Sequence, residues 1–210
     1  DTAMAAANAS LIAEGFEIAS IPSLTATQLN NIDVLWLPPL DAPSPGLNPA
    51  YTFSETIEVL AFLERGGRVL WFGDAGIYNE GDESFLSVFG ISKLDGNYNT
   101  TGPVSAAPRH PILTGPGGAV GTVASAATFG LMDTSAASVT IQDVLTDSAG
   151  PGAFLSVATI PNTTNPSDPA GRLALICDAS IFEQFFTSDD HAALLVNVAR
   201  WLETAPGYTP

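Results

Sequence analysis

Two apolar runs separated by one amphipathic segment constrain this fold more than any other feature of the chain. Residues 33–37 and 68–73 each have the length and composition of a short strand, and the segment between them has helical spacing. A run that is apolar at nearly every position indicates a strand covered on both faces. We therefore predict two parallel strands joined by a right-handed crossover, with helices on both sides of the sheet.

The crossover helix is predicted to begin with Ser54 as its N-cap and Glu55 in its first turn, and to end at Gly66 and Gly67. Helical periodicity places one set of apolar residues toward the core. This set is Ile57, Leu60, Ala61 and Leu63.

Capping residues and periodicity predict the other elements of the chain. The predictions are a helix over 1–14, a strand near a sheet edge over 15–21, a short helical turn at 25–28, a short helix ending at Gly90, a strand over 172–177, and a terminal helix capped by Ser188 with Asp189 and Asp190 in its first turn. Residues 97–169 are rich in Gly, Pro, Thr, Ser and Ala, and contain β-type runs at 138–145 and 153–160. We interpret them as an antiparallel β extension within a single domain covering 1–210.

Charge and composition exclude several classes of function. Six Lys and Arg residues oppose 22 Asp and Glu residues, giving a net charge of −16, which disfavours nucleic acid as a partner. No apolar stretch approaches the roughly 20 residues of a membrane-spanning helix. A single cysteine, Cys177, excludes an internal disulfide. The acidic bias, with Lys93 as the one lysine, favours an extracellular or periplasmic location, with ordinary acidic solubility as the alternative.

Ligands of open α/β sheets bind beyond the carboxyl ends of the parallel strands, so the residues that follow each strand are the candidate site. Asp74, Gly76 and Tyr78 follow one strand, and Asp178 and Ser180 follow another. We take these five as ligand-binding candidates. The two carboxylates could also bind calcium, or act as an acid and a base if burial separated their pKa values. The alternative is that each carboxylate caps the segment after it.

Other chemistry-bearing residues carry weaker signals. Cys177 lies in an apolar strand and is expected to be an inert core residue rather than a nucleophile. His191 is expected at the surface in the first turn of the terminal helix. His110 begins a turn that leads into an extended piece. The turn after Phe72 has the glycines of a nucleophile elbow, but neither serine nor cysteine occupies its apex.

Residues 33–37, the helix after them and residues 62–74 resemble the class I glutamine amidotransferase-like superfamily, particularly its non-amidotransferase branches. Residues 110–112, 173–178 and 197–202 are similar to the same branches, which include ThuA-like domains and the trimerisation domain of some β-galactosidases. The resemblance implies a flavodoxin-like fold. Asp74 and Ala75 stand where amidotransferases carry the cysteine, and no His-x-Glu follows Cys177, so glutaminase activity is not implied.

These observations lead to three functional hypotheses. The first is a non-catalytic ligand-binding or assembly domain of a larger or processed extracytoplasmic protein, whose partner is a protein or a small ligand such as a carbohydrate, with a homo-oligomer as one form of assembly. The second is a hydrolase acting on carbohydrate or a related substrate through Asp74 and Asp178. The third is an extracellular structural domain stabilised by calcium. No cofactor is predicted under the first hypothesis.

Overall fold

The computed structural model describes residues 4–38, 51–74, 79–94, 110–123, 131–146, 152–183 and 186–204. The helices in these ranges are α1 (Ala5–Ala13), α2 (Ala26–Leu29), α3 (Phe53–Glu64), α4 (Asn79–Ser87), α5 (Pro111–Thr114), the 3-10 helix η2 (Ala179–Phe182) and α6 (His191–Glu203). The strands are β1 (Val34–Leu37), β2 (Arg68–Phe72), β3 (Ser92–Leu94), β4 (Leu131–Asp133), β5 (Ile141–Thr146), β6 (Ala153–Ile160) and β7 (Gly171–Ile176).

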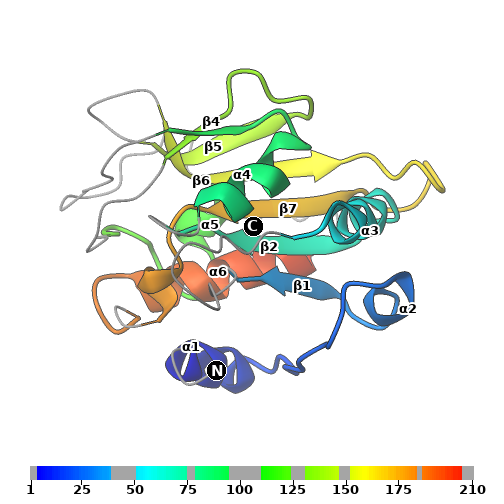
Figure 1. Ribbon diagram of the computed structural model, residues 1–210. Helices are drawn as coiled ribbons and strands as arrows, with labels where there is room; N and C mark the ends of the chain where they lie inside the picture. The colour runs from blue at the N-terminus through cyan, green and yellow to red at the C-terminus, as the bar shows by residue number, and fades with distance from the viewer. Residues whose placement is uncertain are drawn as a thin grey trace, which may run out of the picture.

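The described strands form one mixed sheet with a parallel half and an antiparallel half (Figure 1). Its order is β1-β2-β7-β6-β4-β3, and β5 also pairs with β6. Strands β1, β2 and β7 are parallel to one another, while β6 runs antiparallel to β7, and β4 and β5 run antiparallel to β6. The predicted α/β architecture with an antiparallel extension is therefore confirmed. None of the helices in the described ranges is long and apolar enough to cross a membrane.

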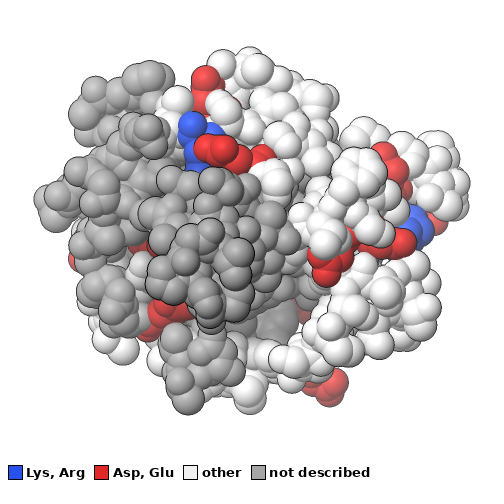
Figure 2. Space-filling view, in the orientation of Figure 1, with Lys and Arg blue, Asp and Glu red and all other residues white. Residues whose placement is uncertain are grey.

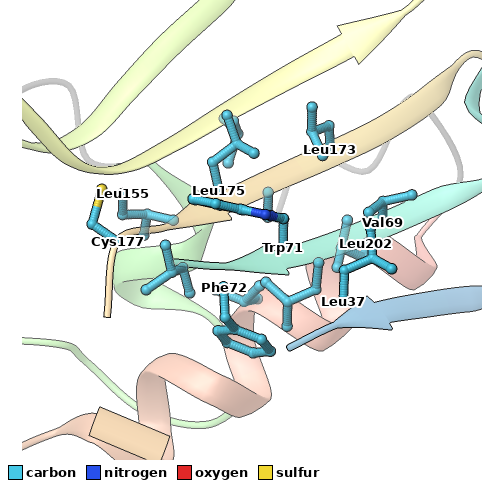
Figure 3. Close-up of a cluster of buried hydrophobic side chains, with 14 of the residues drawn as sticks. Leu37, Val69, Trp71, Phe72, Leu155, Leu173, Leu175, Cys177 and Leu202 are labelled. Atoms are coloured by element: carbon cyan, nitrogen blue, oxygen red, sulfur yellow. The ribbon is translucent and has the colours of Figure 1, made fainter. Parts of the chain in front are cut away.

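Helices cover both faces of the parallel half, as the apolar runs predicted. Neighbouring side chains of β2 point to opposite faces (Figure 3). Trp71 stacks on Phe85 of α4, with ring centroids 6.0 Å apart, whereas Phe72 packs edge-on against Phe182 of η2 at 5.4 Å. Helices α3 and α4 lie in front of the sheet in Figure 1, and α6 lies behind it. Burial of these large rings supplies much of the hydrophobic stabilisation of the core.

Strand β1 is an edge strand among the described residues, which corrects the prediction that residues 33–37 are buried on both faces. It pairs only with β2, and its side chains alternate between half-buried and buried. Leu35 and Leu37 face the core, whereas Val34 and Trp36 are half-buried. The run is apolar because Trp36 still packs edge-on against Phe72, at 5.7 Å between ring centroids.

The N-cap of helix α3 lies two residues before the predicted cap, Ser54, and the helix buries a different face. Thr52 is the N-cap and forms a capping box with Glu55. The buried side chains are Thr56, Val59, Phe62 and Leu63. Ile57, predicted to face the core, is 42% exposed. The helix is rotated toward Phe62 because its ring packs over Gly67, where an added Cβ would lie 2.6 Å away.

Residues 15–21 form no strand, contrary to the sequence prediction. The chain leaves α1 at Gly15, whose φ of +90° suits glycine, and the Phe16 amide then bonds to the Leu11 carbonyl at 3.1 Å. The Arg200 guanidinium lies 4.6 Å above the centre of the Phe16 ring. These contacts hold the segment against α1 and α6 rather than in the sheet, and leave Ile18 45% exposed.

The predictions for the second half of the chain are confirmed in part. Strands β5, β6 and β7 lie where β-type runs were expected, and α4 leads into a turn at Gly90. Strands β3 and β4 were not predicted, because each has three residues and pairs at long range. The extended piece predicted after His110 is instead helix α5, because the His110 side chain accepts a hydrogen bond from the Ile112 amide and Pro111 suits a first helical position.

The terminal helix α6 starts later than predicted. Its N-cap is Asp190, not Ser188. The Asp190 carboxylate does not cap α6 but accepts the amides of Gly121 and Thr122, both at 2.8 Å. On the same helix, the Asn197 side chain bonds to the carbonyls of Ile112 and Gly118, each at 2.9 Å. These bonds hold the segment after α5 on α6, which explains why polar residues stand in the buried part of this helix.

Candidate functional site

The carboxyl ends of β2 and β7 lie side by side and bring two of the predicted site residues together. Main-chain hydrogen bonds continue past the strands, from the Gly73 amide to the Ile176 carbonyl at 2.8 Å and from the Ala179 amide to the Gly73 carbonyl at 3.0 Å. Asp74 directly follows the first pairing residue and Asp178 directly precedes the second. The register of two parallel neighbours therefore places both aspartates at one edge of the sheet, which we call the carboxyl edge.

Asp178 is fully buried and only half of its carboxyl group is hydrogen-bonded. Its Oδ1 accepts the Ser180 amide at 2.8 Å and the Ser180 hydroxyl at 2.6 Å, which makes Asp178 the N-cap of η2. Its Oδ2 is buried and has no hydrogen-bond partner among the described residues. The capping role that the sequence left open thus accounts for one oxygen of Asp178 and not for the other.

Burial raises the pKa of Asp178 from 3.8 to about 6. Loss of hydration is the largest cause, because a buried carboxylate is less stable than a buried carboxylic acid. The two hydrogen bonds from Ser180 act in the opposite direction, and the charges of Asp74 and Glu183 raise the pKa further. The side chain therefore gains and loses its proton close to neutral pH.

Lys93 is a residue of this edge that sequence reasoning did not place there. Its ammonium group donates a hydrogen bond to the main-chain carbonyl of Asp74. Lys93 lies on β3, at the far side of the antiparallel half, so no local pattern connects it with Asp74. The one available signal was compositional, since it is the single lysine of a chain with 22 acidic residues. Lys93, Asp74 and Glu183 are all half-buried.

The other predicted residues have different outcomes. Ser180 is buried and bonds to Asp178. Gly76 and Tyr78 lie outside the described residues. Cys177 is fully buried in the core beside Leu155 and Leu175 (Figure 3), as expected of a core cysteine, and its thiol donates to the Ala153 carbonyl at 3.6 Å.

The two histidines lie in different surroundings. His191 is fully buried at the start of α6, which corrects its predicted surface position. Helix α6 begins at His191 itself, with Asp190 as its N-cap two residues after the predicted cap, and this first helical position is packed against the core. His110 lies at the opposite end of the sheet, near Arg172, the second residue of β7. Neither the structure nor the sequence connects His110 with the carboxyl edge.

A metal centre is not supported by the described ranges, which contain no group of three or more His, Cys, Asp or Glu residues arranged to hold an ion. The surface is nevertheless acidic. Figure 2 shows the few Lys and Arg side chains of one face lying beside Asp and Glu side chains. Anionic ligands are therefore disfavoured both at the carboxyl edge and over the surface around it.

Comparison with solved structures confirms the α/β flavodoxin-like fold. The N-terminal domain of mmIFT52 superposes with a TM-score of 0.69 at 16% identity, over 99% of this chain and 93% of that one. Cytoplasmic protein STM3548 from Salmonella typhimurium gives 0.60 at 14% identity, over 94% and 85% of the two chains. At these identities the likeness concerns the fold. No family model and no curated protein matches the sequence.

Proposed function

We propose that this chain is a non-catalytic ligand-binding domain whose site is the carboxyl edge around Asp178. The observation that carries the proposal is the buried Oδ2 of Asp178, which lacks a hydrogen-bond donor among the described residues. Leaving a buried polar atom unsatisfied costs about 1–3 kcal/mol, more when the group is charged. A ligand that donates a hydrogen bond to this oxygen would recover that free energy on binding.

The position of the site supports the same proposal. Ligands of doubly wound sheets bind where strand ends and loops converge, and Asp74, Asp178 and Lys93 converge at such an edge. The resemblance to non-amidotransferase branches of the class I glutamine amidotransferase-like superfamily fits this reading, because Asp74 and Ala75 replace the nucleophile at the turn after β2. We propose that the domain belongs with those branches and works outside the cytoplasm, as its acidic composition suggests.

The test is binding combined with a search for turnover. Ligand-observed NMR with a mixture of neutral, cationic and anionic metabolites should reveal a compound that binds the wild type and binds Asp178→Asn more weakly. Ester, amide and glycoside substrates should remain unchanged. Turnover that is lost in Asp74→Ala would replace the proposal by the hydrolase hypothesis. Failure of every compound to distinguish the wild type from Asp178→Asn would contradict the proposal.

Calcium is tested separately. A calcium ion that binds the folded state alone would raise the melting temperature as the calcium concentration rises. The proposed function involves no such ion, so we expect the same melting temperature in calcium and in chelator. A rise in calcium that Asp74→Asn removes would support the structural calcium domain instead.

A second candidate function, assembly through α3, rests on a separate surface. Phe53 is 81% exposed and Ile57, one helical turn later on the same face, is 42% exposed. Large apolar side chains exposed side by side on one helix favour association with another protein surface. Sedimentation of the wild type and of Phe53→Ser tests this candidate. A homo-oligomer that dissociates in Phe53→Ser supports it, and a wild-type monomer excludes self-assembly through this face.

A further inference from the structure

We infer that η2 is a pH-sensitive lid, which stays closed over Asp178 while this side chain is protonated and opens more often once it is ionised. The inference goes beyond the proposed function, because it concerns how the carboxyl edge opens rather than what binds there. It follows from the hydrogen bonds at the start of η2, from the burial of the carboxyl group and from the charges around it.

The start of η2 depends on Asp178. Helix η2 has four residues, and its N-cap Asp178 accepts both the amide and the hydroxyl of Ser180 through one oxygen. The Ala179 amide bonds to the Gly73 carbonyl at 3.0 Å, and the Glu183 amide bonds to the Ser180 carbonyl at 3.2 Å. A 3-10 helix has poorer hydrogen-bond geometry than an α-helix and is used in short pieces. A change of charge at Asp178 therefore acts directly on a short and weakly bonded element.

The closed position of η2 keeps Asp178 away from water. Asp178 has no exposed surface, and Ile181 and Phe182 of η2 are fully buried as well. The Oδ2 of Asp178 is buried and has no hydrogen-bond partner within the described ranges. A carboxylate held in this way has neither water nor a donor at that oxygen, and burial of an unpaired charge is costly. The same group becomes hydrated when η2 moves away, so ionisation favours opening.

The charged groups around Asp178 act in the same direction. Asp74, which follows β2, and Glu183, at the end of η2, both act on the carboxyl group with like charge. From the other elements, Lys93 of β3 bonds to the main-chain carbonyl of Asp74, and His191 begins α6, which packs against η2. The like charges of Asp74 and Glu183 are the ones that shift the pKa of Asp178. Ionisation of Asp178 thus adds a third negative charge beside these two.

The direction of the pH effect follows from the pKa of Asp178 in the closed state. Burial raises this pKa from 3.8 to about 6, and opening returns the group to water and to its ordinary pKa. The stabilisation of the closed state is therefore complete below about pH 4 and is lost as pH rises through about 6. Two pKa units correspond to about a hundredfold change in the equilibrium between closed and open η2. Opening should increase over this range and level off above it.

Opening of η2 also gives a ligand access to Asp178. Because the side chain has no exposed surface when η2 is closed, a ligand of the proposed site meets Oδ2 when η2 opens. An ionised carboxylate accepts hydrogen bonds at both oxygens. The protonation state that opens η2 more often is therefore also the state in which the oxygen can accept from a ligand.

Amide hydrogen exchange of the folded protein, measured by NMR between about pH 4 and pH 8, tests the inference without a ligand. The reporters are the amides of Ser180 and Glu183, and the reference is the Arg172 amide, which bonds to the Gly67 carbonyl at the other end of β7. After correction for intrinsic exchange rates, we expect the opening constant at the two reporters to rise about a hundredfold between about pH 4 and pH 7.

Low concentrations of urea separate local opening from global unfolding. An opening that exposes η2 alone exposes little surface and depends weakly on urea, whereas global unfolding depends strongly on it. At each pH, the amides of Ser180 and Glu183 should therefore exchange faster than the Arg172 amide and should respond less to urea.

Two aspartate variants show whether Asp178 controls the opening. Asp178→Asn keeps an oxygen that accepts from Ser180 but does not titrate, so the rise at the η2 amides should disappear. Asp190→Asn is the matched control, because Asp190 also accepts two main-chain amides, those of Gly121 and Thr122, but lies at the start of α6. It should retain the wild-type rise. Protection of the Arg172 amide verifies that each variant is folded.

The inference fails under either of two results. Exchange at Ser180 and Glu183 that matches the Arg172 amide in rate and in urea dependence would show that η2 opens only when the whole protein unfolds. A rise that is absent in the wild type, or that persists in Asp178→Asn, would show that Asp178 does not control η2. If the exchange follows our expectations and no compound distinguishes the wild type from Asp178→Asn, the inference holds and the proposed function fails.

Discussion

The two ends of strand β7 bury charged groups in opposite ways. At its amino end, the guanidinium of Arg172 lies 5.1 Å above the centre of the Trp201 ring and donates to the Trp201 carbonyl and to the Thr204 hydroxyl. The His110 ring also packs against Trp201, with the two ring centroids 5.7 Å apart. At its carboxyl end, Asp178 has one oxygen bonded and one without a donor in the described ranges.

The difference separates structural polar residues from functional ones. Arg172 joins β7 to the end of α6, and its hydrogen bonds and ring contact offset the cost of partial burial. Asp178 is buried more deeply, and its Oδ2 has no hydrogen-bond partner among the described residues. Sequences break a local rule of this kind mainly at functional sites. The amino end therefore stabilises the fold, while the carboxyl end is the one that we propose binds a ligand.

Removing Arg172 should have the largest effect on stability. Arg172→Met keeps an aliphatic chain but loses the hydrogen bonds to the end of α6 and the contact with Trp201. Bonds from charged donors and cation–π contacts together predict a loss of about 3 kcal/mol in the free energy of unfolding, measured in urea. Arg68→Met is the matched control, because Arg68 pairs in register with Arg172 on β2 and repels it. Equal losses of unfolding free energy in Arg172→Met and Arg68→Met would contradict the stabilising role that we assign to Arg172.

Removing the charge of Asp178, at the carboxyl end of β7, should increase stability rather than decrease it. Asp178→Asn keeps an oxygen that accepts from Ser180 and abolishes the buried charge. The raised pKa means that the folded state disfavours the ionised form, so the contribution of Asp178 to stability is greatest below about pH 4 and is lost as pH rises through about 6. At about pH 8 we expect the variant to be more stable by about 2 kcal/mol, after allowing for the buried amide. Destabilisation at this pH would show that Oδ2 has a partner.

His110 and Asp178 should oppose each other on acidification. Burial lowers the pKa of His110 to about 4, with the charge of Arg172 acting in the same direction. The stability that this neutral histidine contributes is present above 6.5 and is lost as pH falls through 4. Between about pH 8 and 5 we expect Asp178→Asn to lose about 2 kcal/mol and His110→Asn to gain about 1.5 kcal/mol, with the wild type nearly unchanged.

Asparagine is the suitable replacement at position 110, because it caps a helix as well as the histidine does and does not titrate. Stability curves of the two single variants and of the double variant measure each contribution. A double variant whose stability still varies strongly over this range would assign the pH dependence to other groups.

The smallest expected effect concerns Ser180. Ser180→Ala removes the hydroxyl group that donates to Oδ1 of Asp178, while the main-chain amide of residue 180 still donates to the same oxygen. We expect a loss of about 1 kcal/mol near neutral pH and a further rise in the pKa of Asp178. NMR titration checks the direction. A pKa that falls in this variant would contradict the assignment of the hydrogen bonds.

The parallel half of the fold could be predicted because its signals are local. Apolar runs and a helix between them specify β1, α3 and β2, and the same reasoning gives β7. The meeting of Asp74 and Asp178 follows from the fold class, since strand ends converge at the carboxyl edge. The face of α3 was misjudged because the close approach of Phe62 to Gly67 decides it, and this contact is not visible in helical periodicity.

The contribution of the antiparallel half to the site could not be predicted, because it depends on a contact between residues far apart in the sequence. Lys93 reaches Asp74 from β3, a strand of three residues that has no periodicity of its own. The burial of His191 likewise depends on where α6 begins, and three polar residues in a row, from Ser188 to Asp190, each provide a plausible cap. Long-range pairing and competing caps are decided by tertiary packing, which a single sequence does not display.

The central claim is that Asp178 is a buried carboxyl group with an unsatisfied oxygen, and a ¹³C NMR titration of its carboxyl carbon tests this most directly. Asp178→Asn assigns the resonance. We predict a midpoint at about 6, because burial destabilises the ionised form. A midpoint at or below the ordinary value of 3.8 would show that the carboxylate is fully bonded within the protein and would contradict the account.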